Sequence, residues 1–520
     1  MRHGQSRRAF LSNVGRGMVV ASVGTSVAHE MGLVSRGWAD EMTDRPLQFG
    51  DREPLVRFMQ ETPAAALIPA LGQKLKDGVG LQDLLTAAAL ANARAFGGED
   101  YIGFHTLMAL GPAWHMSREL PAALQPLPVF KVLYRNCDRI AKTGGLGKET
   151  LRSIEPQSQS LESTSLRDAS RKLNKSEAER ILATLAQAGP ANAFNALLME
   201  VEDETEVHRV ALPYRAWDLM GIIGQDHALT FLRQSLRYCV DAEARPHSTA
   251  TRDALAHVMS EFHLDTRQPG DRVPDDQWVE ETARLLLSSQ PADAAAAVGA
   301  ALADGISPDA VTEAAAVAAN QILLRDPGRP QKYASDNKPA GSVHGDSIGL
   351  HCCDAVNAWR NIARVADDRN RFAAAVLSAY QVARDRIVPG TEGERFIDRE
   401  ALPHAADREQ VKESERGPLL AAAEEAIRGR DQRRTVAVLD KLLSRGEAEQ
   451  EIVGLLRRFA ISEDGALHAE KYYRTVTEER ATIRPRFRAN QLLALGRVTA
   501  SAFGYPAPGY DETRELLRVS

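Results

Sequence analysis

The stretch Tyr101-Ile-Gly-Phe-His-Thr-Leu-Met-Ala-Leu-Gly-Pro-Ala-Trp-His115 places two histidines in an otherwise apolar segment. A second pair stands in Ser342-Val-His-Gly-Asp-Ser-Ile-Gly-Leu-His351, again after an Ala-rich segment and a break that contains Gly and Pro. An isolated histidine follows each pair, His208 after the first and His468 after the second. This order predicts a duplicated helical protein whose histidines converge near an internal pseudo-twofold axis.

Composition predicts an all-α fold. The chain has 520 residues, and aromatic residues make up only 6% of them. Ala, Leu, Arg and Glu dominate, and these residues favour helices. We expect two pseudo-symmetric helical halves around a central cavity lined by histidines. The net charge of -6 offers no basic footprint, so nucleic acid is not expected as a partner.

The order of expected elements repeats along the chain. An Ala-rich helix over 63–76, an Asp-Gly stop and a second Ala-rich helix over 81–96 are echoed by 291–303, another Asp-Gly and 307–324. The halves are therefore placed at 41–243 and 277–520, with a linker over 244–276. The alternative is a solenoid, in which any two helix pairs look alike.

The N-terminus resembles a twin-arginine export signal. Ser6-Arg7-Arg8-Ala9-Phe10-Leu11 precedes a weakly apolar segment, and residues 1–40 are taken as signal and linker. Charges interrupt the apolar run, so no stable membrane span is expected. This resemblance implies a periplasmic or secreted protein with the twin-arginine translocase as its partner during export. Because that route carries folded cargo, often with a cofactor inserted, it favours a bound metal or organic group.

Four cysteines do not form a zinc-ribbon or covalent haem motif, because neither CxxC nor CxxCH occurs. They are expected as buried free thiols rather than disulfides. They are Cys137, Cys239, Cys352 and Cys353.

Histidines at repeat-related positions are the candidate metal ligands, because imidazole suits Fe, Zn, Cu and Ni. The expected four-histidine set is His105, His208, His344 and His468. Three further histidines are candidate cofactor contacts, namely His115, His227 and His351. Asp346 or Glu470 is expected to orient an imidazole, and Tyr214, Trp217 or Tyr472 to line a substrate pocket. The candidate catalytic residues are Tyr214, Tyr472 and Asp346.

Three of these segments resemble questin-oxidase-like proteins, a family of helical oxygenases that open rings of aromatic polyketides. The segments run from Phe104 to His115, from His208 to Ala216 and from Val343 to His351. The resemblance implies an oxygenase in which His105, His208 and His344 carry over, whereas His468 comes from the repeat. That family takes electrons from a cytoplasmic nicotinamide cofactor, which an exported protein would not meet. Substrate and reductant therefore stay open.

The sequence contains no P-loop and no HExxH. We expect an exported metal-dependent oxidoreductase, oxygenase-like, that acts on a small organic substrate. The expected cofactor is a transition metal, iron first and zinc second. Two alternatives remain: a haem-binding protein with two axial histidines, and a non-catalytic helical scaffold in the bacterial envelope.

Overall fold

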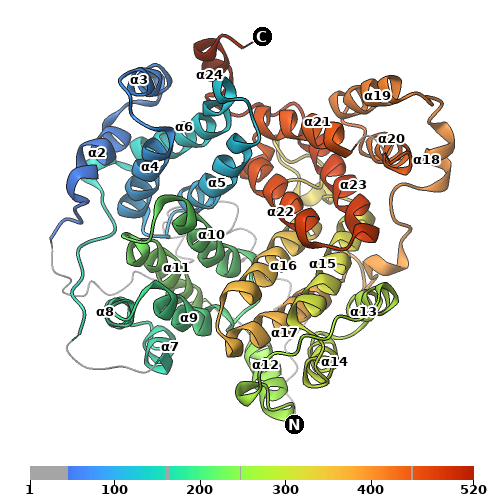
Figure 1. Ribbon diagram of the computed structural model, residues 1–520, viewed down its shortest axis with the longest axis horizontal. Helices are drawn as coiled ribbons and strands as arrows, with labels where there is room; N and C mark the ends of the chain where they lie inside the picture. The colour runs from blue at the N-terminus through green and yellow to red at the C-terminus, as the bar shows by residue number, and fades with distance from the viewer. Residues whose placement is uncertain (1–44, 158–162, 246–247, 447–448, 520) are drawn as a thin grey trace. The chain divides into compact units, whose positions relative to one another are not determined.

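A computed structural model describes residues 45–157, 163–245, 248–446 and 449–519 (Figure 1). Within these ranges the chain forms 23 α-helices and seven short 3-10 helices, with isolated β-bridges but no strand. The all-α prediction is confirmed. None of the helices in these ranges is long and apolar enough to cross a lipid bilayer. The predicted export signal lies outside the described residues.

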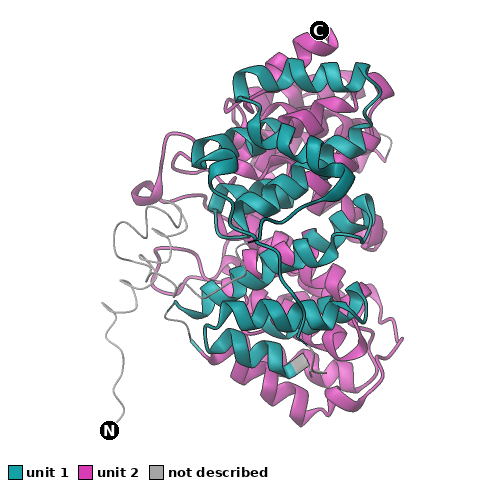
Figure 2. Ribbon diagram, turned by 90° about the vertical axis from the view of Figure 1, so that its left-hand side faces the viewer, with its two compact units in different colours: residues 1–108, 133–201, 216–248 teal, residues 109–132, 202–215, 249–520 magenta. Residues whose placement is uncertain are grey.

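The chain divides into two compact units, each built from separate segments (Figure 2). Unit 1 contains residues up to 108, 133–201 and 216–248, and unit 2 contains 109–132, 202–215 and 249–520. Three helices contribute residues to both: α5 (Tyr101–Arg118), α6 (Pro126–Thr143) and α10 (Val207–Ile223). The predicted halves 41–243 and 277–520 stay a prediction.

Unit 1 otherwise consists of α2 (Glu53–Glu61), α3 (Ala64–Lys76), α4 (Leu81–Phe96), α7 (Ser163–Arg171), α8 (Lys175–Ala186), α9 (Pro190–Val201) and α11 (Ala228–Glu243), with the 3-10 turns η1 (Gly50–Arg52) and η3 (Gly145–Gly147). Its core contains paired charges. Arg94 on α4 is 1% exposed and donates to Glu53, 2.8 Å away. Glu179 on α8 accepts from Arg233 and Arg237 of α11. The three buried arginines are therefore compensated by opposite charges, as burial requires.

Unit 2 contains the longer helical array. Its helices are α12 (Ala250–Glu261), α13 (Asp276–Ser288), α14 (Pro291–Ala303), α15 (Pro308–Arg325), α16 (Ile348–Val365), α17 (Asp368–Asp385), α18 (Ala405–Gln410), α19 (Arg416–Arg428), α20 (Gln432–Ser444), α21 (Glu449–Ser462), α22 (Ala469–Thr482), α23 (Pro485–Ala502) and α24 (Tyr510–Leu517). Its 3-10 turns are η2 (Ala122–Leu124), η4 (Leu264–Thr266), η5 (Gln331–Tyr333), η6 (Phe396–Asp398) and η7 (Gly465–Leu467).

Helix α15 is the centre of this array. It is buried along nearly its whole length, and it packs against α13, α16, α17 and α23. A helix that is apolar on all sides belongs in a core, and alanine lets neighbouring helices approach closely. Helix α16 packs in turn against α22. This packing brings the beginnings of α16 and α22 into one region, where the candidate site lies.

The cysteine prediction is confirmed. Cys137, Cys239, Cys352 and Cys353 are all buried, and none of them forms a disulfide bond within the described residues. Burial raises the pKa of the Cys137 thiol to about 12, so this thiol stays protonated at neutral pH.

Candidate functional site

Three histidines from distant parts of the sequence converge within unit 2. His351 lies in the first turn of α16, His468 directly precedes α22, and His208 is the second residue of α10. The Nε2 atoms of His351 and His468 are 3.2 Å apart. The ring centroids of His208 and His351 are 5.4 Å apart, with the planes at 83°. His208 and His468 are buried, whereas His351 is partly exposed.

Helix caps fix the first residues of α16 and α10, the helices that carry His351 and His208. Ser347 caps α16 by accepting from the Leu350 amide, and His351 donates its own amide to the Ser347 carbonyl. Glu206 caps α10 in the same way, because its Oε2 accepts from the Arg209 amide at 3.1 Å. The helices therefore start at defined residues, and the imidazoles in their first turns are positioned accordingly.

Hydrogen bonds set the tautomers of two rings. His468 Nδ1 lies 2.8 Å from the Ala466 carbonyl, and His208 Nδ1 lies 2.6 Å from Glu206 Oε1. A carbonyl oxygen only accepts, so the His468 proton is on Nδ1 and the Nε2 lone pair points to His351. Metal-ligating histidines commonly donate their other nitrogen to a carbonyl or carboxylate in this way. Both rings have the support that ligands need.

Burial keeps the His351 and His468 rings neutral. It lowers the pKa of His351 to about 3, with His208 contributing next, and it lowers the pKa of His468 well below the usual value, with Lys471 and His351 contributing. Burial also raises the pKa of Asp354, which accepts from Thr475 at 2.7 Å. At neutral pH both rings are therefore uncharged, and His351 donates its Nε2 proton to the His468 Nε2 lone pair across the 3.2 Å contact. A metal ion bound by both Nε2 atoms would displace this proton, as metal binding to histidine generally does.

The fit to a metal ion is good for two ligands. Two imidazoles at about 2.0–2.1 Å on one tetrahedral ion have nitrogens about 3.3–3.4 Å apart. The observed 3.2 Å between His351 and His468 matches that separation. In the observed side-chain conformations, however, no three His, Cys, Asp or Glu residues in the described part of the chain are arranged to hold an ion. His208 would have to turn from its edge-on orientation to become a third ligand.

His344, predicted as a ligand, forms two hydrogen bonds within the fold. Its Nε2 lies 2.8 Å from the Asn337 carbonyl, and its Nδ1 lies 2.8 Å from Ser501 Oγ. The ring is fully buried, and burial lowers its pKa. The carbonyl can only accept, so Nε2 carries the proton and Nδ1 accepts from the serine hydroxyl. Both ring nitrogens are engaged by protein groups.

The predicted orienting carboxylates have other partners. Asp346 binds Arg329 at 2.6 Å and Lys338 at 3.1 Å. Burial opposes ionisation of this carboxyl, but Lys338, Arg329 and, to a smaller extent, His351 together hold its pKa well below the usual range. Glu470 is paired with the buried Lys131, 3.1 Å away. Asp346 is therefore an electrostatic neighbour of His351.

The predicted pocket tyrosines differ in their surroundings. Tyr214 donates to Glu478 at 2.8 Å, and Arg215 donates to the same oxygen at 3.1 Å. The Tyr472 hydroxyl is buried and forms no hydrogen bond of ordinary geometry with the described residues. Burial, with a smaller contribution from the adjacent Cys353, raises its pKa well above the usual value.

The remaining predicted histidines do not add a described ligand to this cluster. His105 and His227 belong to unit 1, where His105 Nδ1 lies 2.7 Å from the Tyr101 carbonyl. His227 contacts the edge of Phe49, and burial, followed by Arg52, lowers its pKa. His115 lies on α5 in unit 2 and is partly exposed. Their predicted roles stay predictions.

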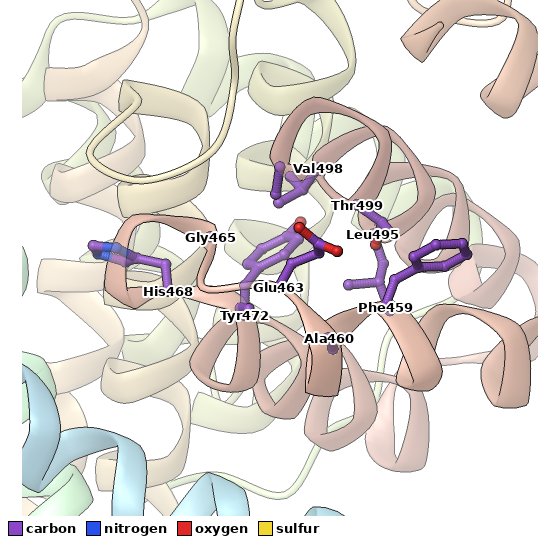
Figure 3. Close-up of a pocket in the computed structure, with 11 residues that line it drawn as sticks. Phe459, Ala460, Glu463, Gly465, His468, Tyr472, Leu495, Val498 and Thr499 are labelled. Atoms are coloured by element: carbon purple, nitrogen blue, oxygen red, sulfur yellow. The ribbon is translucent and has the colours of Figure 1, made fainter. Parts of the chain in front are cut away.

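One small cavity adjoins His468. It measures about 20 Å³ and lies among α21, α22 and α23, lined mainly by apolar groups such as Phe459, Leu495 and Val498. Figure 3 shows the His468 imidazole directed away from the other labelled side chains. Ligand pockets usually measure about 300–1,000 Å³, so this cavity has room for a water molecule but not for an organic substrate. The predicted cavity lined by several histidines is not shown.

A serine-hydrolase motif occurs next to the cluster but serves another purpose. Gly345-Asp-Ser347-Ile-Gly349 matches GxSxG, which in hydrolases places a serine on a turn between a strand and a helix. Here Ser347 caps α16 and donates to the Val343 carbonyl at 2.7 Å. Gly349 is required by packing, because a Cβ there would lie 2.8 Å from the Leu323 Cα. In this protein the motif begins a helix, and no strand precedes it within the described residues.

Helices α5 and α16 begin with the same four-residue pattern, Ile-Gly-x-His. Ile102-Gly103-Phe104-His105 begins α5, and Ile348-Gly349-Leu350-His351 begins α16. In each case a glycine Cβ would collide with the preceding helix, with Phe96 of α4 or Leu323 of α15. His351 therefore follows Gly349 at the same spacing as His105 follows Gly103. The Ile-Gly-x-His repeat is the sequence signal that identifies it.

Comparisons with models of protein families, with curated proteins and with solved structures find no match to the chain.

Proposed function

We propose that the protein is a metal-dependent oxidoreductase whose ion is held by His351 and His468, with His208 as the third imidazole. The observation that carries the proposal is the 3.2 Å separation of the two Nε2 atoms. The proposed metal is iron first and zinc second, because imidazole ligands suit both. A bound iron would supply redox chemistry toward a small organic molecule.

The chain's own groups support this role. Ala466 and Glu206 accept from Nδ1 of His468 and His208, which keeps Nε2 of each ring as the ligand atom. Burial raises the pKa of Asp354 although the hydrogen bond from Thr475 opposes this shift, so its carboxyl group is suited to hold a proton. His351 is the partly exposed member of the cluster, and a substrate would approach on its side.

The geometry favours a bare ion over haem. Two axial histidines on one haem iron lie on opposite sides of it, which places their nitrogens about 4 Å apart with a macrocycle between them. The observed 3.2 Å fits ligands on the same side of an ion. A non-catalytic scaffold predicts dispersed histidines, and the convergence of three argues against it.

The internal duplication is also proposed, and helix order supports it. Helices α4 and α5 correspond to α15 and α16, and α8, α9 and α11 correspond to α20, α21 and α23. Packing within each unit follows the same scheme: α11 packs on α8 and α9, and α23 packs on α20 and α21. His208 and His468 both bond to the residue two positions before them. Export by the twin-arginine route and the questin-oxidase-like relation stay predictions from the sequence.

Metal content and the visible spectrum of the purified full chain test the proposal. We expect about one equivalent of metal, lost in His351→Ala and in His468→Ala, and retained in His257→Ala, which removes an exposed histidine. A Soret band would replace the proposed ion by haem. A colourless, metal-free protein whose stability is unchanged by His351→Ala would favour the scaffold.

A further inference from the structure

The backbone directly before His468 adopts the left-handed conformation. Gly465, Ala466 and Leu467 have φ values of 56°, 50° and 73°. For L-residues the left-handed conformation brings Cβ close to a carbonyl oxygen, so it occurs at isolated positions and rarely in a run. Two of these three residues are not glycine. Strain of this kind persists only where the surroundings impose it, and it concentrates at functional sites.

Hydrogen bonds clamp the turn on its entry side. Asp464 Oδ2 accepts from the Leu467 amide at 3.0 Å, and the Asp464 amide donates to the Tyr505 carbonyl at 2.9 Å. The neighbouring Glu463 accepts from the amides of Gly504 and Tyr505, each at 2.9 Å. The segment after α23 therefore holds the chain where it enters the turn, and Asp464 closes the turn.

The turn places a hydrogen-bond acceptor, the Ala466 carbonyl, beside the His468 imidazole. The Ala466 carbonyl lies 2.8 Å from His468 Nδ1, and the His468 amide donates to the Gly465 carbonyl at 3.1 Å. Backbone and ring of His468 are thus both bonded to the turn. The opposite nitrogen, Nε2, is the atom that lies 3.2 Å from His351.

We propose that the left-handed turn is a positioning device that fixes the His468 ring for the metal site, with Ala466 and Asp464 as positioning residues; this rests on the proposed function. The Cβ of Ala466 confines its backbone to a narrow left-handed region, whereas glycine would be free over a much wider one. Alanine at this position therefore makes the turn more strained than glycine would, but also less flexible. A stiff turn holds the carbonyl, and through it the imidazole.

The substitution Ala466→Gly tests the proposal, because it relieves strain without adding atoms. Leu173→Gly is the matched control, since Leu173 has a φ of 59° in an exposed turn of unit 1. Two readouts are compared in the full chain: the Kd for Co²⁺, followed by its visible spectrum, and the His468 tautomer, followed by ¹⁵N NMR after selective histidine labelling. Thermal stability is recorded for both variants.

We expect Ala466→Gly to weaken Co²⁺ binding about tenfold, as loss of ligand support does elsewhere, and to mix the His468 tautomers without lowering Tm. Leu173→Gly should leave both readouts unchanged. Asp464→Asn, which keeps an oxygen acceptor, should retain affinity that Asp464→Ala loses. An unchanged Kd and tautomer in Ala466→Gly would overturn the inference. If wild-type protein binds no Co²⁺ yet Ala466→Gly mixes the tautomers, the metal proposal fails while the positioning of His468 stands.

Discussion

His351 and His468 face each other through their Nε2 atoms at 3.2 Å although 117 residues separate them in the chain. Helix α16 carries one ring and the turn before α22 carries the other, and these two helices pack together. The rings share a region in which burial lowers the pKa of each. This shared environment has consequences for stability as well as for ligand binding.

The metal-free protein should lose stability as the pH falls below about 6.5, the ordinary histidine value. The folded state disfavours protonated His351 down to its pKa of about 3, whereas the unfolded chain takes up the proton at the ordinary value. The unfolded state therefore binds more protons in this window, and the free energy of unfolding rises with pH across it. The contribution is at most about 1.4 kcal/mol per pH unit for one histidine.

Urea denaturation at pH 7, 6 and 5 measures this dependence. His351→Gln should flatten it, while His257→Gln, which removes an exposed histidine, should not. Equal pH dependence in wild type and His351→Gln would show that His351 is readily protonated in the fold.

Replacing Glu206 by Gln should weaken metal binding about tenfold, because a carboxylate behind a ligating histidine raises its basicity. Glu206 Oε1 lies 2.6 Å from His208 Nδ1. Isothermal titration with Zn²⁺ gives the affinity of each variant, and Glu204→Gln removes a nearby charge as the control. Unchanged affinity in Glu206→Gln would remove His208 from the proposed ligands.

Lys131→Met should destabilise the fold by about 3–5 kcal/mol, the usual cost of leaving a buried charge unpaired. Lys131 is 1% exposed and donates to the carbonyls of Ala460 and Glu463 at 2.8 and 2.7 Å, besides its pairing with Glu470. Lys142→Met removes an exposed pairing and should cost less than about 1 kcal/mol. Chemical denaturation compares the two, and similar losses would argue against the buried network.

Ser347→Ala should cost about 1 kcal/mol of stability through loss of the α16 cap. It should leave metal content and any turnover measurable, because the serine serves the helix start and is not a nucleophile. Thermal unfolding and metal analysis check both parts. Failure of Ser347→Ala to bind metal while folding normally would indicate a direct role for this hydroxyl.

Sequence patterns predicted the fold class because it depends on local properties. Ala-rich periodic segments, Asp-Gly stops and capping residues such as Ser307 act within one helix, and the structure has α15 and its cap at that position. The sequence also predicted that His208 and His468 converge, and both rings lie near the ring of His351, but their role as ligands stays a prediction. What it could not provide was the hand of the backbone at Ala466, which is set by the Tyr505 segment and the side chain of Asp464.

The proposed choice of His351 over His344 as a ligand rests on tertiary contacts. Both stand in the same short stretch, and spacing alone does not separate them. Ser501 and the Asn337 carbonyl engage both nitrogens of His344, and neither partner is near it in a recognisable motif. The glycine at 349 carried the missing information, because it marks where α16 approaches α15.

The discontinuous make-up of unit 2 has a consequence for biosynthesis. Residues 109–132 and 202–215 belong to a unit whose remaining segment runs to the end of the chain. During translation, His208 leaves the ribosome long before His351 and His468 exist. The proposed metal site could therefore be completed only after His468 has been translated, so an ion would bind after all three histidines have left the ribosome.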